Sequence, residues 1–124
     1  MTTPSVAEAV EAAREVDLTT FGRTTGNASR RTLWITTDSN GRLYIRSGMG
    51  PSRDWPRNLL ANQRAVLHIG ERDVPVHARQ VTDRAELLAS RDAVKRKYGR
   101  ELPSSKDGEP LTLPEQATFE LILD

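Results

Sequence analysis

The stretch of the sequence with the most chemical content is residues 42–62, RLYIRSGMGPSRDWPRNLLAN. Two glycines, Gly48 and Gly50, let the backbone turn sharply and let another molecule approach closely. Asp54 stands at the N-cap position of a short helix, because the proline at position 56 is tolerated only in a first helical turn. Backbone N–H groups and the positive end of a helix favour an anion, although a strand followed by glycines also fits a plain hairpin connection. Three cations nearby add to that attraction: Arg46, Arg53 and Arg57.

A second polar loop precedes this stretch, at residues 22–31, GRTTGNASRR. Its arginines, Arg23, Arg30 and Arg31, suit a phosphate because a guanidinium can donate two parallel hydrogen bonds, but a solvated loop has the same composition. Fifteen of the eighteen basic residues are Arg, which a GC-rich genome explains equally well. Residues 18–72 hold nine Arg and three acidic residues, so positive charge gathers around both loops. That distribution suits an anionic ligand such as a phosphate-bearing cofactor.

Two tryptophans stand near these loops. Trp34 lies in a strand predicted at residues 32–37, and Trp55 lies in the first turn of the predicted helix. Either side chain is suited to stacking on a flat ligand ring. A tryptophan in a strand is more often part of the core, so both interpretations stay open.

Other kinds of catalytic site find little support in the sequence. His68 and His77 lie on facing predicted strands, but without a nearby carboxylate they make a poor metal site and are interpreted as ordinary strand residues. The chain has no cysteine, no nucleophile elbow and no P-loop. The acidic residues of the basic region, Asp38, Asp54 and Glu71, are turn or cap candidates. We therefore expect no metal, and we expect a bound cofactor to carry the chemistry if the protein is an enzyme.

The elements that hold these loops are short strands joined by hairpins. An Asn-Gly turn joins residues 32–37 to residues 42–47, and a second hairpin joins residues 64–69 to residues 74–81. Pro75 lacks a ladder N–H, which predicts an edge strand or a bulge in the last of these. Because hairpins dominate and helices do not alternate with strands, the pattern predicts an antiparallel barrel with peripheral helices. Further strands are expected at 18–21 and 118–123, and helices at 5–16, 54–62 and 83–98.

Length and composition narrow the class of protein. With 124 residues the chain is expected to form one domain, residues 1–124. The absence of cysteine and of a long apolar segment predicts a cytoplasmic protein with no membrane span. A net charge of +1 and few aromatic residues argue against a nucleic-acid-binding barrel.

Several motifs resemble the nitroreductase/quinone reductase family of split β-barrel proteins, which are deazaflavin-dependent oxidoreductases. The resemblance covers about residues 18–82, through TTFGRTTG, LW, DSNGRLYIRSGMG and DWPRNLLANQRAVLHIG. Its most specific part is W-x-x-N-L-x-A-N at residues 55–62, followed by G-R-x-[ST]-G at residues 22–26. That family is related more distantly to flavin-binding pyridoxamine-phosphate-oxidase-like proteins. The resemblance implies a mainly β (α+β) fold, an antiparallel six-stranded split β-barrel with peripheral helices.

The resemblance also implies a cofactor site and one catalytic residue. The cofactor is expected to be a deazaflavin, coenzyme F-420, with FMN as the alternative. The family often has a basic residue at the position of Thr24 and sometimes a Lys at the position of Gly48. Ser47 is expected to be catalytic, as a polar donor to negative charge that develops on the substrate. The implied cofactor-binding residues are Arg23, Thr24, Thr25, Arg30, Arg31, Ser47, Gly48, Gly50, Trp55 and Asn58.

The function that these expectations describe is hydride transfer from a reduced deazaflavin. The substrate would be a small aromatic molecule or quinone, a nitroaromatic or an activated alkene. Two alternatives stay open, an FMN-binding split-barrel oxidoreductase and a non-catalytic flavin or deazaflavin carrier. The resemblance further implies a homodimer, because small split barrels of this family usually complete the cofactor site across a two-fold interface.

Overall fold

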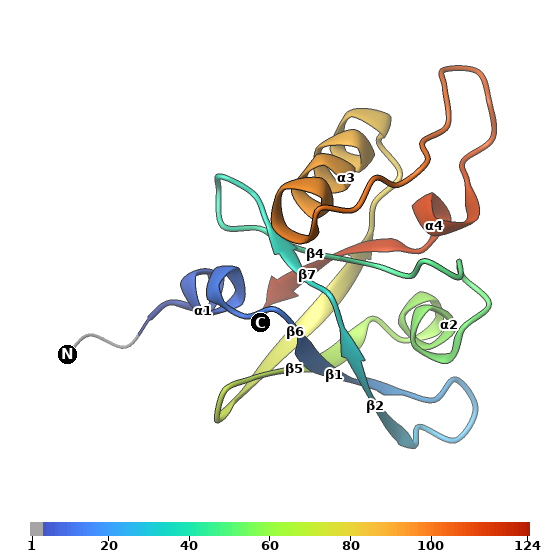
Figure 1. Ribbon diagram of the computed structural model, residues 1–124. Coiled ribbons are helices and arrows are strands. Elements are labelled where there is room, and N and C mark those ends of the chain that lie inside the picture. The colour runs from blue at the N-terminus through green and yellow to red at the C-terminus, as the bar shows by residue number, and fades with distance from the viewer. Residues whose placement is uncertain (1–3) are drawn as a thin grey trace.

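The computed structural model describes residues 4–124 (Figure 1). In this part of the chain, four helices surround a single antiparallel sheet of seven strands. The strands are β1 (Val16–Phe21), β2 (Ala28–Leu33), β3 (Thr36–Thr37), β4 (Leu43–Arg46), β5 (Arg64–Ile69), β6 (Arg72–Gln80) and β7 (Thr118–Leu123). The helices are α1 (Val6–Ala12), α2 (Asp54–Ala61), α3 (Arg84–Tyr98) and α4 (Leu113–Gln116).

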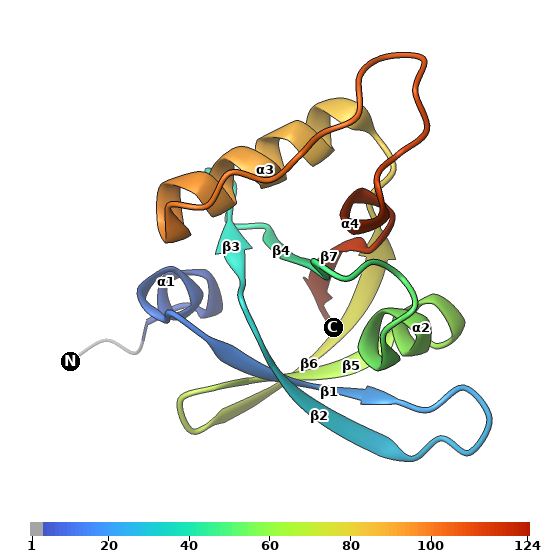
Figure 2. The ribbon, with the colours of Figure 1, turned by 45° about the vertical axis from the view of Figure 1, so that its right-hand side comes forward.

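The sheet curls into a half-barrel because one continuous segment of the chain, residues 28–37, supplies both of its edge strands. The strand order is β2-β1-β5-β6-β7-β4-β3, so β2 and β3 are the two edges. These edges are consecutive in the sequence, separated by Trp34 and Ile35, and Figure 2 shows them as two parts of one bent path. β2 pairs with β1, whereas β3 pairs with β4. The mainly β architecture expected from the sequence is therefore confirmed, and its curvature is consistent with a split barrel.

The predicted strand count of six was wrong, since the described sheet has seven strands. The predicted strand at 32–37 is interrupted at Trp34 and Ile35, where pairing changes from β1 to β4. Its first half also begins earlier than expected, at Ala28, so part of the predicted loop at 22–31 is strand. The long pairing of β2 with β1 from Leu33 to Ala28 extends that half.

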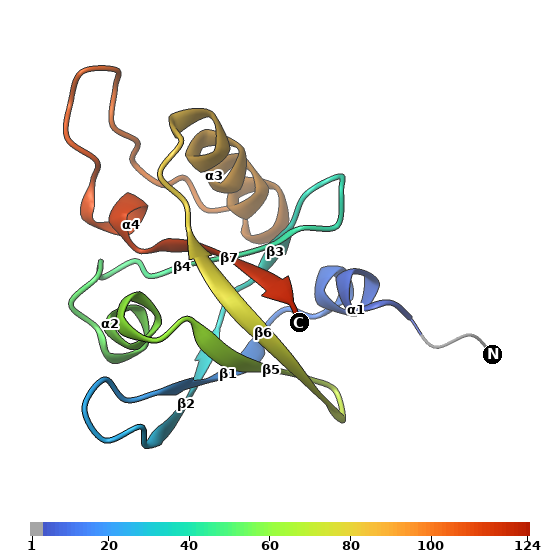
Figure 3. The same cartoon turned by 180° about the vertical axis from the view of Figure 1, so that it is seen from behind.

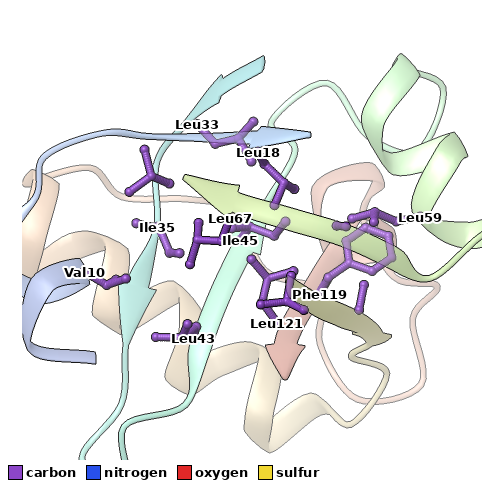
Figure 4. Packing of buried hydrophobic residues seen from close by; sticks show 14 of the residues in the cluster. Val10, Leu18, Leu33, Ile35, Leu43, Ile45, Leu59, Leu67, Phe119 and Leu121 are labelled. Carbon is purple, nitrogen blue, oxygen red and sulfur yellow. The ribbon is translucent and has the colours of Figure 1, made fainter. Parts of the chain in front are cut away.

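The core fills the inside of the curled sheet (Figure 4). Leu18, Leu67 and Phe119 come from three different strands and are each no more than 1% exposed. Leu59 of α2 and Val10 of α1 close the two open ends of this cluster. Burying such side chains contributes roughly 1.5–3 kcal/mol each, so the core holds the loops around it in place.

Three local expectations need correction. The helix predicted at 5–16 ends at Ala12, because Val16 is needed in β1, opposite Leu33. The N-cap of α2 is Arg53 and makes no side-chain cap bond, so the predicted cap at Asp54 was wrong by one residue. No helix was expected between residues 98 and 118, but this segment contains α4, which begins with a capping box between Thr112 and Glu115.

The proline in β6 has a different explanation from the one expected. β6 lies between β5 and β7, so it is not an edge strand (Figure 3). Its pairing with β7 stops at Val76 and Leu123, one residue from Pro75. The Pro75 carbonyl accepts a bond from the backbone N–H of Asp124, so its missing N–H falls where the β7 ladder ends.

The longest helix, α3, begins and ends as the sequence predicts. The side chain of Asp83 caps its first turn, and Gly99 adopts the left-handed conformation (φ 69°) at its end. The Tyr98 hydroxyl contacts the backbone of Ile35, and Lys97 donates to the carbonyls of Val10 and Ile35. These bonds hold α3 over the β3–β4 side of the sheet (Figures 1 and 2). Of the helices in residues 4–124, none combines the length and hydropathy needed to cross a membrane.

Candidate functional site

A groove of about 670 Å³ opens at the bend between β2 and β3. One wall is the bend itself, and the other is the segment that leads from the end of β4 to the start of α2. Its size falls within the usual range for small-molecule sites. The residues that line it are Glu15, Arg31, Thr32, Leu33, Trp34, Arg46, Ser47, Gly48, Met49, Ser52, Arg53, Asp54 and Trp55.

The rim of the groove carries charges of both signs. Arg31 donates to the Asp54 carboxylate over 3.2 Å, and the two side chains are 51% and 67% exposed. Asp54 occupies the first turn of α2, so its carboxylate already faces the positive end of that helix. An incoming phosphate would therefore have to share Arg31 with Asp54. Arg53 lines the same rim and adds a third charge.

One wall of the groove is the ring of Trp34, which packs against another aromatic ring on its far side. Trp34 stacks on Tyr98 of α3 with ring centroids 4.1 Å apart and planes within 2°. Trp34 remains 37% exposed, so it is not a core residue. A ring held in this way is suited to stacking against a flat ligand.

Behind the groove lies a smaller pocket of about 270 Å³, here called the inner pocket. Trp34, Arg46 and Gly48 line both spaces, so the inner pocket and the groove adjoin at these residues. Its remaining walls come from the bend before β3, from β3, β4 and α3, and from the segment after α3. They are Ile35, Thr36, Tyr44, Ile45, Ser90, Val94, Arg100 and Leu102.

Arg46 is the most unusual side chain of the two spaces. Its Nη2 donates to the Leu87 carbonyl over 3.1 Å. Its Nε and Nη1 are buried and have no hydrogen-bond partner in residues 4–124. Burial lowers the pKa of the Arg46 guanidinium, an effect that the charge of Glu115 partly opposes. A half-buried cation with buried, unpaired donors is costly, which makes Arg46 a candidate for ligand binding.

Ser47 stands where the groove and the sheet meet. Its backbone N–H donates to Ala117, and its carbonyl accepts from Gly50, so the main chain on both sides is held. The residue is only 5% exposed but lines the groove. No hydrogen bond of its hydroxyl to another described residue occurs. This hydroxyl is therefore available to a ligand in the groove.

Four of the residues expected from the sequence line the groove together: Arg31, Ser47, Gly48 and Trp55. Trp55 is only 8% exposed and packs edge-on against Phe119, with ring centroids 6.0 Å apart. Its ring thus serves the core as well as the groove wall. A Cβ added at Gly48 would meet nothing within 4 Å, so this position has open space beside it.

Three other expected residues lie outside the groove lining and have structural contacts. Asn58 is buried and donates to the Thr20 hydroxyl over 3.0 Å, which fastens α2 to β1. Gly50 adopts a left-handed φ of 82°, and an added Cβ would lie 2.8 Å from Leu113. Arg30 pairs with Asp17 over 2.8 Å. Hydrogen bonds from Thr32 and Arg30 lower the pKa of that carboxyl.

The remaining expected residues form the tip of the β1–β2 hairpin. Arg23, Thr24 and Thr25 are exposed in the turn between Gly22 and Asn27. The Gly22 N–H donates to the Asn27 carbonyl and closes this turn. All three views show the hairpin tip on the same side of the molecule as α2 (Figures 1–3). None of these three residues lines the groove itself.

The histidines lie away from both spaces. His68 contacts Thr19 and Asp73, each over 2.7 Å, whereas His77 contacts Asp124. β5 and β6 place His68 opposite Asp73 and His77 opposite Arg64, so the two rings do not face each other. In residues 4–124 no group of three or more His, Cys, Asp or Glu side chains could hold a metal ion.

The expected cofactor-binding residues did not include Arg46 or Trp34, although the sequence indicated Arg46 as a nearby cation and Trp34 as a ring suited to stacking. A usable signal was the alternation of each strand. Leu33 and Ile35 are core residues, so Trp34 between them must point the other way. The same holds for Arg46, which follows Ile45 on β4. That these two side chains line one space depends on how β3 pairs with β4 and on α3, which the alternation does not reveal.

Comparisons with solved structures support the fold. A candidate pyridoxamine 5′-phosphate oxidase from Listeria innocua has a TM-score of 0.66 at 14% identity, over 94% of this chain and 88% of that one. An F420-H2-dependent reductase (FDR-A) has a TM-score of 0.55 at 20% identity, over 87% and 93%. A heme-binding protein from Mycobacterium smegmatis has a TM-score of 0.65 at 15% identity, over 98% of this chain but about half (52%) of its own length. Identities this low show a shared fold alone.

The sequence comparisons give the family. No protein with a curated description matches the chain. One family model, described as "Uncharacterized protein conserved in bacteria (DUF2255)", matches residues 7–121, which is nearly the whole chain. The protein therefore belongs to the DUF2255 family.

Proposed function

We propose that this protein is an oxidoreductase that binds a reduced deazaflavin (coenzyme F-420) in the groove and reduces a quinone, a nitroaromatic or an activated alkene. The observation that carries the proposal is the groove at the β2–β3 bend. It combines a supported Trp34 ring, the Ser47 hydroxyl, and the cations Arg31 on β2 and Arg53 just before α2. The split-barrel fold shared with a deazaflavin-dependent reductase adds support.

The groove residues fit such a cofactor in two respects. Its size and the exposed Trp34 ring suit a flat tricyclic ring system. Arg31, Arg53 and the N-terminus of α2 would hold a phosphate, with Arg23 on the nearby hairpin available to a longer acidic tail. When bound, a reduced deazaflavin supplies a hydride.

The protein's own contribution would be orientation and charge stabilisation. Trp34 would fix the plane of a ring in the groove, and the Gly48 backbone leaves space for close approach. The Ser47 hydroxyl would donate to the atom of the substrate on which negative charge develops. The described residues lining the groove include no histidine, so the proton that completes the reduction would come from water.

FMN remains the alternative cofactor, and a non-catalytic carrier of either ring remains the alternative function. Heme is less well supported, although a heme-binding protein shares the fold. Heme iron needs an axial His, Met, Cys or Tyr. Among the described residues lining the groove, Met49 is the only side chain of these types, and it is 61% exposed.

A second copy of the chain would complete the groove. Met49 and Leu113 are 61% and 59% exposed and lie beside the loop that forms one wall. Covering them in a two-fold contact would bury apolar surface and deepen the cofactor site. We therefore propose a homodimer. A monomer by light scattering at micromolar concentration, with full cofactor binding, would contradict it.

The experiment that tests the function is a titration of purified protein with F420, FMN and hemin, followed by turnover. We expect F420 to bind most tightly, and reduced F420 to be oxidised when menadione or a nitroaromatic is added. Binding of FMN alone would favour the FMN alternative. Binding of a ring without turnover across quinones and nitroaromatics would favour the carrier. Selective hemin binding would overturn the proposal.

A further inference from the structure

Two residues that line the inner pocket have buried polar atoms without hydrogen-bond partners. They are Nε and Nη1 of Arg46 and the hydroxyl of Thr36, none of which has a hydrogen-bond partner in residues 4–124. The two Arg46 nitrogens carry three N–H donors between them. Buried donors are nearly always paired in native proteins, so several in one small space indicate a ligand.

These groups share one side of the β3–β4 ladder. Thr36 lies opposite Tyr44, and Arg46 follows Tyr44 by two positions on the same strand, so all three side chains point to the α3 side. Continuing this register places Trp34 opposite Arg46. The pocket therefore has a polar floor formed by Thr36 and Arg46, and the Trp34 ring lies at its border with the groove.

The charge around the floor is positive. Among residues 4–124, no acidic side chain lines the inner pocket, whereas Arg100 lines it together with Arg46. The carboxylate of Glu115 acts on Arg46 through its charge, but it is not within hydrogen-bond distance of it. Its Oε1 instead accepts the backbone N–H groups of Ser105 and Thr112. Arg46 thus lacks a hydrogen-bonded counterion.

The remaining walls limit the ligand to a small, flat molecule with apolar faces. Ile35, Val94 and Leu102 supply aliphatic surface, and Trp34 supplies an aromatic edge. A volume of about 270 Å³ is small for a ligand site and excludes a nucleotide or a cofactor. A planar carboxylate suits a guanidinium in an apolar pocket better than the larger and more strongly hydrated phosphate.

We propose that the inner pocket binds the carboxylate of a small aromatic or unsaturated acid, with Arg46 and Thr36 as its hydrogen-bond donors. The flat part of this acid would extend past Trp34 and Gly48 toward the groove. Its role as the substrate rests on the proposed function. The binding itself rests only on the pocket.

The test is calorimetric titration of the protein without cofactor, using trans-cinnamate and its uncharged amide, cinnamamide. We expect cinnamate to bind at least about tenfold more tightly than cinnamamide, because a charge-assisted bond replaces a neutral one. Arg46→Met should weaken cinnamate binding about 10- to 100-fold and remove the preference over the amide. Thr36→Val should weaken it several-fold.

The matched control is Arg57→Met, which removes an equal charge from an exposed position on α2, outside the inner pocket. Circular dichroism spectra and melting curves of each variant confirm that it is folded. Equal binding of cinnamate to wild type and Arg46→Met, equal binding of acid and amide, or no binding of either would overturn the proposal. Displacement of cinnamate by equimolar inorganic phosphate would also overturn it, by showing a general anion site.

The test of cinnamate binding is independent of whether a cofactor binds. If F420 and FMN both fail to bind but cinnamate binds through Arg46, the proposed redox function fails and the acid pocket stands. If a cofactor binds and turns over quinones while cinnamate does not bind, the function stands and the acid pocket fails.

Discussion

Two arginines contact the same helix and have opposite surroundings. Arg79 on β6 donates to Glu120 on β7, over 2.9 Å, and to Glu86 on α3. Arg46 on β4 reaches the next residue of α3, Leu87, but only through its carbonyl. Hydrogen bonds to Glu86 and Glu120 raise the pKa of Arg79, whereas burial lowers that of Arg46.

The ion pairs of Arg79 indicate a structural role. Glu86 also accepts from the Tyr44 hydroxyl over 2.7 Å, and burial together with this carboxylate raises the pKa of Tyr44 to about 12. The charges and hydrogen-bonding groups of this network all have partners within the protein. In contrast, side-chain polar groups of Arg46, Thr36 and Ser47 have no hydrogen-bond partner among the described residues. The contacts of Arg79 are thus complete within the protein, whereas those of Arg46 leave donors for the ligand that we propose.

The largest effect is expected at Ser47. Ser47→Ala should lower turnover by about ten- to a thousandfold, which is the scale for losing one donor to developing negative charge. Cofactor affinity should change less, because the hydroxyl would act on the substrate. Steady-state oxidation of reduced F420 with menadione measures both. Ser39→Ala, in an exposed turn, is the control; equal loss in both variants would remove Ser47 from the site.

The second prediction compares the effects of replacing Arg79 and Arg46 on the free energy of unfolding. Arg79→Met should lower the free energy of unfolding by about 1–2 kcal/mol, because two largely buried carboxylates lose their partner, with a reduction for the partial exposure of Arg79. Arg46→Met should change it by less than about 0.5 kcal/mol, or raise it, because a half-buried guanidinium with two unpaired nitrogens is replaced by an apolar side chain of similar length. Urea denaturation measures both values.

If Arg46→Met were the more destabilising of the two, Arg46 would have a structural role that its contacts do not reveal. Acid binding completes the comparison. Arg79→Met should bind cinnamate as the wild type does, provided that binding is measured well below its melting temperature.

A third prediction concerns Gly48 and Gly50, to which the sequence analysis assigned the same role in the loop. Gly48 has open space and an ordinary φ, so Gly48→Lys should fold normally and tighten phosphate-bearing cofactor binding by about three- to tenfold. Gly50→Ala should lower the free energy of unfolding by about 1–3 kcal/mol, because of its left-handed φ and the contact with Leu113. Fluorescence titration and thermal melts separate the two effects. Loss of stability in Gly48→Lys would contradict the open space beside that position.

The sequence predicted the hairpins well, because alternation and turn residues act locally. The Asn40-Gly41 turn, β5, α3 and β7 were all recognisable. The bend at Trp34 was not, because it depends on pairing with two strands distant from each other in the sequence.

The same limit applies to the candidate site. The central stretch from Arg46 to Trp55 was predicted as a candidate anion site from its glycines and cations, and it forms one wall of the groove. The inner pocket was missed, because its roof is supplied by Ser90 and Val94 of a helix far along the chain. Unpaired donors are a property of packing, which composition and spacing do not contain.

The smallest effect is expected from pH. Burial would raise the pKa of Glu115, but backbone and side-chain hydrogen bonds from Thr112 and Ser105 outweigh it, and its pKa lies below the usual value. A carboxyl whose pKa is lower folded than unfolded adds stability above its unfolded pKa, near 4.5, and this stability is lost as the pH falls through the folded value. Wild type should therefore lose stability below about pH 4.5 more steeply than Glu115→Gln, with the difference under about 1 kcal/mol.

Urea midpoints at pH 7, 5 and 4 measure this difference. Glu115 is also the acid whose charge acts on Arg46, so the same variant sharpens the comparison of the two arginines. With Glu115 neutralised, Arg46 should attract an external carboxylate more strongly, and Glu115→Gln should bind cinnamate more tightly than the wild type at pH 7. Weaker binding in Glu115→Gln would mean that Glu115 positions the pocket rather than competing for its cation.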